Sequence, residues 1–167
     1  MRIADKTELL VAWPLALELS WHNGVLLGSR VRHARGQVPT GLTAAGRTLL
    51  AALERYVDGQ AVAWPRVPME LHGLPEFTRR VLLALRDRVP HGATTTYGGL
   101  ATLAGSPGAA RAVGQIMARN PWPLLVPCHR VLGADGALTG FSAEGGLDLK
   151  RLLLEIENAA QPVACRV

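Results

Sequence analysis

A cysteine beside a histidine, Cys128-His129, is the pair best suited to covalent chemistry in this chain of 167 residues. Only the thiolate of a cysteine is a useful nucleophile, so its pKa of about 8.5 has to be lowered by a neighbouring base or positive charge. His129 and Arg130 are candidates for both roles. Adjacent side chains on a strand point to opposite faces, so the dipeptide alone does not predict a hydrogen bond between them. A lone cysteine is also more often a small buried hydrophobe than a nucleophile.

The longer sequence around this pair resembles a known family. Residues 120–131 read Asn-Pro-Trp-Pro-Leu-Leu-Val-Pro-Cys-His-Arg-Val. This string closely resembles the active-site signature of the methylated-DNA-protein-cysteine methyltransferases, also called O6-alkylguanine-DNA alkyltransferases. Upstream, Thr-Tyr-Gly at 96–98 and residues 106–114 match the same family in order and spacing. The resemblance runs from about residue 77 to residue 157 and rests on several motifs that recur together.

The resemblance implies direct repair of double-stranded DNA. The alkyl group of O6-alkylguanine, with O4-alkylthymine as an alternative substrate, would pass irreversibly to Cys128. The product is a thioether, which neither water nor cellular thiols cleave readily, so one chain would act once. His129 would act as a base on Cys128 through a water, and Glu157 would orient its imidazole. Glu155 is the competing choice for this carboxylate, because the family pattern of two leucines and a later glutamate fits in two registers here.

Further roles follow from the same resemblance. Asn120 would support the active-site loop, and the Tyr97 hydroxyl would donate to N3 of guanine as the base departs. Arg111 matches the arginine finger that fills the place of the flipped nucleotide, whose extrusion costs a few kcal/mol. Its helix would lie in the minor groove. The other expected DNA contacts are Thr96, Ala109, Ala110, Ala112 and Gly114. The expected base pocket consists of Met117, Pro123, Val131, Phe141 and Ser142.

The distribution of charge agrees with a polyanionic partner. The formal net charge is +5, and residues 71–134 alone carry seven cations and two anions, which is also +5. A basic excess confined to one segment is typical of nucleic-acid binding, although many basic faces are merely solvated. Some relatives bind zinc through N-terminal cysteines. Since this chain has none there, we expect no metal and no other cofactor.

Cysteine usage and hydropathy bear on the compartment. Cys128 and Cys165 do not make a disulfide framework, which fits a reducing cytoplasm. The apolar run at 9–19 is interrupted by Pro14 and Glu18 and lacks the features of a signal peptide. No stretch is long and apolar enough to span a bilayer. We therefore expect a cytoplasmic monomer that does not bind membranes.

The first 70 residues predict a small α+β domain. Apolar residues alternate from Leu15 to Trp21, and Asn23-Gly24 offers a hairpin turn before a second strand at 25–27. Thr43 can cap a helix that Gly59 ends. Residues 61–71 are interpreted as a short edge strand or a linker. In the family this domain resembles a ribonuclease-H-like sheet and carries no catalytic residues.

Residues 71–167 predict a mostly helical, winged-helix-like domain for DNA binding and alkyl transfer. An amphipathic helix is expected over 77–88, and Thr96 can cap a short helix over 97–104. Ser106 can cap the next helix, with Pro107 in its first position, which makes a helix-turn-helix pattern. Asp135-Gly136 predicts a hairpin turn with arms at 130–132 and 137–139. A glycine-rich loop at 140–146 precedes a helix over 147–157.

Two other classes of protein remain open from the sequence. A non-catalytic binder of alkylated DNA would need the same helices, but such relatives lack the cysteine. A cysteine hydrolase of a small substrate could use Cys128, His129 and Glu157 and would turn over repeatedly. Turnover therefore distinguishes the hydrolase from the alkyl acceptor.

Overall fold

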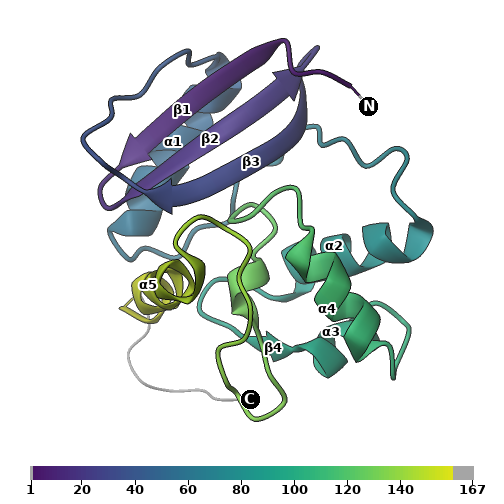
Figure 1. Cartoon of the computed structure of the whole chain (residues 1–167). Coiled ribbons are helices and arrows are strands. Elements are labelled where there is room, and N and C mark those ends of the chain that lie inside the picture. Colours follow the sequence, from purple (N-terminus) through teal and green to yellow (C-terminus); the bar gives the residue numbers. More distant parts are fainter. Residues whose placement is uncertain (1, 160–167) are drawn as a thin grey trace.

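The computed structural model describes residues 2–159 of the chain, so Cys165 lies outside the described residues. It has an α+β fold, as expected, with a three-stranded antiparallel sheet in the order β1-β2-β3 and α1 across one face of it (Figure 1). The elements in chain order are β1 (Lys6–Ala12), β2 (Leu15–His22), β3 (Val25–His33), α1 (Ala44–Val57), α2 (Glu76–Arg88), β4 (Thr95–Thr96), α3 (Tyr97–Leu103), α4 (Ala110–Ala118), the 3-10 turn η1 (Cys128–Arg130), β5 (Val131–Leu132) and α5 (Gly146–Ala159).

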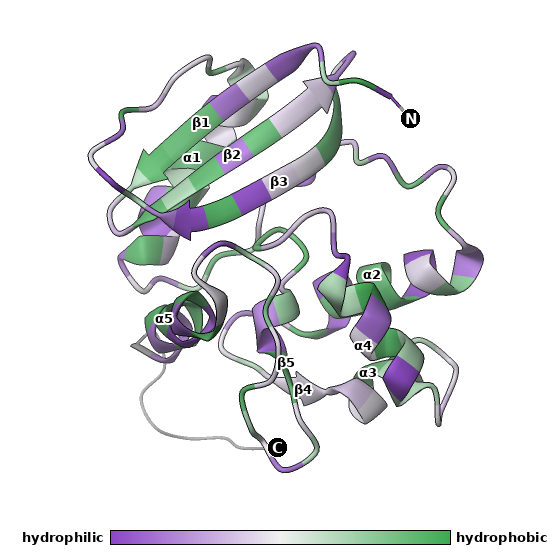
Figure 2. Ribbon diagram, viewed as in Figure 1, coloured by the Kyte–Doolittle hydropathy of each residue, from purple (hydrophilic) through white to green (hydrophobic). Residues whose placement is uncertain are grey.

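The predicted hairpin is confirmed and forms two of the three strands, with β2 in the centre of the sheet and β3 at its edge. β2 and β3 pair from Leu15↔His33 to His22↔Val25, and Asn23 and Gly24 both have positive φ in the turn between them. Such a two-residue turn matches the twist of the strands that it joins. Hydrophilic and hydrophobic residues alternate in the C-terminal part of β3 (Figure 2), where the buried Val31 lies between Arg30, which is exposed, and Arg32, which is half-buried. One face of the sheet is therefore apolar and packs on α1.

The start of α1 is fixed by a buried carboxylate as well as by its predicted cap. The Thr43 side chain accepts from the backbone N–H of Gly46 at 3.0 Å. Glu8 of β1 is fully buried and accepts from Trp21 Nε1 at 2.9 Å and from the backbone N–H of Thr43. A negative charge at a helix N-terminus is favourable because the first N–H groups there have no partners in the helix.

Residues 58–75 run between the two parts of the chain with little regular structure. A single bridge joins Met69 to Leu26 of β3, so the alternative of a short edge strand is reduced to one residue pair. From here on, residues 2–70 are called the N-terminal half and residues 71–159 the C-terminal half. Buried apolar residues of both halves form one continuous core.

Two predictions about the C-terminal half were wrong in detail. The helix expected from Ser106 begins only at Ala110, because residues 106–109 form a separate turn, in which Gly108 has a φ of +92°. Asp135-Gly136 does lie in a turn, closed by the bond from Gly133 N–H to the Ala137 carbonyl. However, β5 pairs in parallel with the distant β4, and residues 137–139 form no strand.

None of the helices within residues 2–159 is long and apolar enough to cross a membrane.

Candidate active site

The cysteine and the histidine lie in one tight turn between the two halves. Cys128, His129 and Arg130 form η1, and all three are buried, with Cys128 only 5% exposed. This differs from a strand, in which neighbouring side chains alternate between faces. β5 follows directly and pairs with β4, so the turn is tied to the start of α3.

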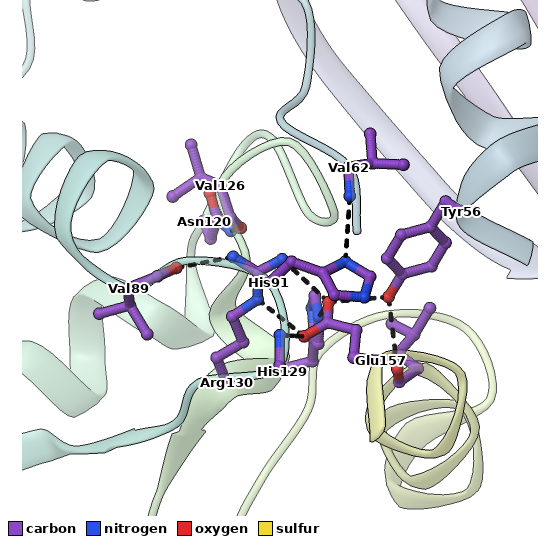
Figure 3. A network of polar contacts seen from close by, with 11 residues as sticks. Tyr56, Val62, Val89, His91, Asn120, Val126, His129, Arg130 and Glu157 are labelled. Carbon is purple, nitrogen blue, oxygen red and sulfur yellow. Dashed lines mark hydrogen bonds and ion pairs between the residues drawn. The ribbon is translucent and has the colours of Figure 1, made fainter. Parts of the chain in front are cut away.

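Glu157 of α5 is the hub of a buried polar network (Figure 3). Its Oε1 lies 2.6 Å from His129 Nε2. Arg130 donates to the same carboxylate through Nε at 2.9 Å and Nη2 at 3.0 Å. The Gly92 backbone N–H donates to Oε2 at 3.2 Å, and the Tyr56 hydroxyl donates to Oε1 at 2.9 Å. Charge-assisted bonds of this kind are the strong ones.

The pKa values of this network predict a neutral base beside an ionised acid. Burial alone would raise the pKa of Glu157, but the hydrogen bonds and charges of His129 and Arg130 lower it far below its usual range. Burial lowers the pKa of His129, against the opposing attraction of Glu157. An ionised carboxylate only accepts, so His129 carries its hydrogen on Nε2. Its buried Nδ1 has no partner among the described residues and holds a free lone pair.

The Cys128 thiol is protonated at rest. Burial raises its pKa, against a hydrogen bond from the Asn120 side chain and the positive charge of Lys150. Arg130, one of the two candidates for this effect, has its guanidinium bound to Glu157 and to the Val89 carbonyl. Cys128 therefore needs a base at the moment of reaction.

Asn120 braces the loop that leads to the cysteine. Its Nδ2 donates to the Val126 carbonyl at 2.8 Å, and its Oδ1 accepts from the Trp122 backbone N–H at 3.0 Å. Between them Leu124, fully buried, has a φ of +75°. A non-glycine residue in this region costs of order 1 kcal/mol and persists only where the surroundings enforce it.

Strand β3 holds the same loop from the N-terminal half. The Ser29 backbone N–H donates to the Pro121 carbonyl at 2.8 Å, and its hydroxyl donates to the Pro123 carbonyl at 3.0 Å. Trp122 Nε1 donates to the Leu26 carbonyl at 3.2 Å. Sequence reasoning did not find this contact, because no local spacing indicates which loop an edge strand will meet.

Lys150 is a second residue that sequence reasoning missed. It is fully buried, and its Nζ donates to the Val131 carbonyl at 2.7 Å and to the Thr139 carbonyl at 2.9 Å. It thereby joins β5 to the residue just before the glycine-rich loop, with its charge near Cys128. A signal was available, because Lys150 and Glu157 are seven residues apart and must share a face of one helix. Glu155, the competing carboxylate, is exposed on another face.

The residues expected to contact DNA lie around one shallow, open groove. Thr96, Tyr97, Ala110, Arg111 and Gly114 line it together with Gly98, Gly108 and Ala134. Arg111 is exposed. Two of the expected contacts do not line the groove, namely Ala112, which is exposed, and Ala109, which is half-buried. A side chain at Gly114 would lie 3.9 Å from the Tyr97 ring. The Tyr97 hydroxyl accepts from Thr139 Oγ1 at 3.0 Å.

The residues expected to form a base pocket are only partly brought together. Asn120, Pro123 and Ser142 line one groove of about 730 Å³, whose other wall is β2 and β3. Met117 and Val131 are buried in the core, and Phe141 is half-buried against it.

The fold and the site together define a class of protein, namely a cysteine-dependent one in which a buried Cys128, His129 and Glu157 adjoin a small-residue helix with an exposed arginine. Comparison with known proteins makes this specific, since residues 76–159 match the family described as "6-O-methylguanine DNA methyltransferase, DNA binding domain". The chain belongs to the family of methylated-DNA-protein-cysteine methyltransferases.

Individual relatives agree over most of the chain. A protein of Mycolicibacterium paratuberculosis named methylated-DNA–protein-cysteine methyltransferase is 43% identical over 128 residues, which cover 75% of this chain and 74% of that protein. One of the same name from Methanosarcina acetivorans is 49% identical over 64% of this chain and 65% of its own. The crystal structure of Mycobacterium tuberculosis OGT in complex with DNA has a TM-score of 0.72 and 36% identity, and covers 92% of this chain and 93% of that one.

Proposed function

We propose that this chain repairs double-stranded DNA by transferring the alkyl group of O6-alkylguanine to Cys128, once per chain, with O4-alkylthymine as an alternative substrate. The observation that carries the proposal is the buried His129, which donates from Nε2 to Glu157, keeps a free lone pair on Nδ1 and directly follows Cys128 in η1. The turn η1 supplies the nucleophile Cys128 and the base His129, and α5 supplies the carboxylate of Glu157 that orients the base.

The chemical step is an in-line displacement. Nδ1 of His129 takes the thiol proton through a water, and Sγ of Cys128 forms a bond to the alkyl carbon. The bond between that carbon and O6 breaks, and its electrons leave with the guanine. Tyr97 donates a hydrogen bond to N3 and so stabilises the departing base. Asn120 supports the active-site loop through its bond to the Val126 carbonyl.

Binding to DNA uses the groove along α3 and α4. Small residues let α4 approach the minor groove closely; they are Ala109, Ala110, Ala112 and Gly114. Thr96 contacts the DNA. Arg111, exposed at the start of α4, fills the space that the flipped nucleotide leaves. Met117, Pro123, Val131, Phe141 and Ser142 form the pocket that receives the base.

We also infer the finer organisation of the chain. The three-stranded sheet with α1 supports a ribonuclease-H-like domain over residues 1–70. The pair α3 and α4, with β4 and β5 beside it, supports a winged-helix-like domain with a helix-turn-helix over residues 71–167. A monomer in a reducing cytoplasm would keep Cys128 as a free thiol.

The test is the intact mass of the protein after incubation with excess duplex containing O6-methylguanine. We expect one methyl group per chain, at Cys128, and no further turnover. Cys128→Ala should abolish transfer and still bind duplex, because affinity rests mainly on phosphate contacts. Cys165→Ala is the matched control and should react normally. Continued turnover would indicate a hydrolase, and an unmodified wild-type protein that binds duplex would indicate a non-catalytic binder.

A further inference from the structure

We propose that Tyr56, on α1 of the N-terminal half, is a positioning residue for alkyl transfer, because its hydroxyl holds the Glu157 carboxylate against His129. This inference rests on the proposed function of Cys128. It extends the active machinery into the half of the chain that family resemblance leaves without catalytic residues.

The contact is direct and fully enclosed. Tyr56 has no exposed surface, and its hydroxyl lies 2.9 Å from Glu157 Oε1. Its other acceptor, the Leu153 carbonyl, is farther away at 3.3 Å and belongs to the same helix, α5. Burial and the nearby Glu157 raise the pKa of Tyr56 well above its ordinary value. The hydroxyl therefore keeps its proton and remains a donor throughout the pH range in which the protein works.

Two aromatic rings pack against the ring of Tyr56, and Figure 3 shows one of them, His91. The Trp64 ring lies 5.5 Å away between centroids at 42°, and the His91 ring lies 5.6 Å away in an edge-on arrangement at 81°. Aromatic pairs in these geometries are favourable beyond the area that they bury. A donor on a ring fixed in this way defines one position for its acceptor.

The hydroxyl acts on the oxygen that matters for the base. Oε1 is the atom bound by His129 Nε2, and it also accepts from Arg130 Nη2. Oε2 accepts from Arg130 Nε and from Gly92. Tyr56 therefore shares Oε1 with the imidazole and fixes both the rotation of the carboxylate and the charge that His129 receives. The charged or titratable groups that face Glu157 are His129 and Arg130 from η1, Tyr56 from α1, and His91 from the segment after α2.

The removal of this one hydroxyl has a definite electrostatic consequence. When Oε1 of Glu157 loses this hydrogen-bond donor, the carboxylate attracts the protonated imidazole of His129 more strongly. The pKa of His129 therefore rises. The carboxylate is also free to rotate, so the imidazole is oriented less well. A merely structural tyrosine would change neither the titration of His129 nor the rate at a temperature where the protein is folded.

The experiment compares Tyr56→Phe with wild type in single-turnover reaction with the free base O6-benzylguanine, followed from pH 5 to 9. We expect a rate at neutral pH lower by about tenfold, comparable to one hydrogen bond to a charged group. The acid limb of the profile should move to higher pH. Trp64→Phe is the matched control, because it keeps an aromatic ring against Tyr56 and leaves the hydroxyl on Glu157, so its acid limb should stay in place.

A second measurement keeps the test decisive if Tyr56→Phe folds poorly. Site-specific 3-fluorotyrosine at position 56 keeps the ring and hydroxyl but makes the phenol a stronger donor, so the acid limb should move to lower pH. An unchanged rate and acid limb in folded Tyr56→Phe, or an acid limb that fluorination does not move, would overturn the inference while wild-type transfer to Cys128 stands. A wild-type chain that never becomes alkylated would instead refute the proposed function itself.

Discussion

The buried lysine is the residue whose removal should be most informative. Lys150 joins Val131 to Thr139 and places a positive charge near Cys128. Lys150→Met should raise the thiol pKa further and release the loop that carries Ser142. We expect single-turnover reaction with O6-benzylguanine to slow by about tenfold and its alkaline limb to move to higher pH. Lys6→Met removes the only other lysine, at an exposed position, and should react like wild type.

The protonation state of His129 sets a second prediction at this scale. Burial lowers its pKa from an ordinary value of 6.5, so the base stays neutral at and below pH 6.5 until its own lower pKa is reached. The rate with O6-benzylguanine should therefore be insensitive to histidine protonation between pH 6.5 and 7.5, and should fall only in more acidic solution. A rate that halves near pH 6.5 would mean that the pKa of His129 is not lowered and that the imidazole is more hydrated than its burial indicates.

At the scale of elements, α4 yields a prediction about base flipping. Arg111 is exposed at its first turn, beside the groove formed with α3. If it fills the space of an extruded base, Arg111→Ala should slow repair of duplex O6-methylguanine strongly, by an amount comparable to the few kcal/mol of unstacking. Reaction with the free base needs no flipping and should change little.

The decisive comparison for Arg111 is the single-turnover rate at saturating duplex beside the rate with free O6-benzylguanine. Equal slowing on both substrates would mean that Arg111 supports the fold or the pocket. Loss of one phosphate contact alone would weaken duplex binding and lower the salt slope by about one unit, and the flipping step would be unchanged.

Gly46, in the first turn of α1, is a helical glycine at which alanine should destabilise the protein. Replacing a glycine inside a helix by alanine normally stabilises by up to about 1 kcal/mol. At Gly46, however, an added Cβ would lie 2.5 Å from Glu8 Oε2, and that carboxylate is buried and held by Trp21. Gly46→Ala should therefore destabilise by about 1–3 kcal/mol. Gly114→Ala, where the nearest contact is an ordinary 3.9 Å, is the control and should not lower the unfolding temperature.

Local signals were enough to predict most elements. Alternation in β2 and the caps Thr43 and Thr96 gave the hairpin and the starts of α1 and α3. The start of α4 was wrong because the turn containing Gly108 has the same capping residues as a helix. The proposed hairpin after β5 was wrong because that strand pairs with a partner about 35 residues upstream, β4.

Prediction of the site was limited in the same way, because contacts between residues far apart in the sequence leave no local signal. The family resemblance pointed to Cys128, to His129 and to Glu157, with Glu155 as the alternative. The structure joins His129 to Glu157 and places Cys128 in the same turn as His129. Lys150 was missed although its spacing from Glu157 on one helix was a signal. Tyr56 and Ser29 were not found, because each contacts the site across a long separation in sequence. Their own surroundings in the sequence resemble ordinary core or strand positions.

For the whole molecule, the Glu157 network predicts sensitivity to acid. The pKa of Glu157 is lowered in the fold, so its contribution to stability is complete above the unfolded value of 4.5 and is lost as the pH falls below it. His129 is buried neutral, so stability also declines below pH 6.5, where the unfolded imidazole binds a proton. Tyr56 has a raised pKa and resists ionisation in the fold, so stability should fall again above pH 10.

Glu157→Gln tests this account by unfolding at several pH values. At pH 7 the variant leaves Arg130 without its carboxylate in the interior, which should cost about 3–5 kcal/mol in the free energy of unfolding. The difference from wild type should shrink below pH 4.5, where the wild-type carboxylate begins to lose its advantage. A difference that is constant from pH 7 to pH 3 would contradict the lowered pKa. Glu155→Gln, exposed on the same helix, should match wild type throughout.

The hydrogen bonds between β3 and residues 121–123 limit which homologous sequences can be recombined with this one. A crossover near residue 70 would join a foreign β3 to this chain's own active-site loop, so the contact would be inherited from two parents. The backbone groups that make these bonds, the N–H of Ser29 and the carbonyl of Leu26, are available in any amino acid other than proline. The hydroxyl on the Pro123 carbonyl is not, and a side chain at Gly28 would lie 3.3 Å from the Pro121 carbonyl. A recombinant protein would therefore keep an intact loop only if the foreign β3 has a small residue at position 28 and a short side chain with a hydroxyl at position 29.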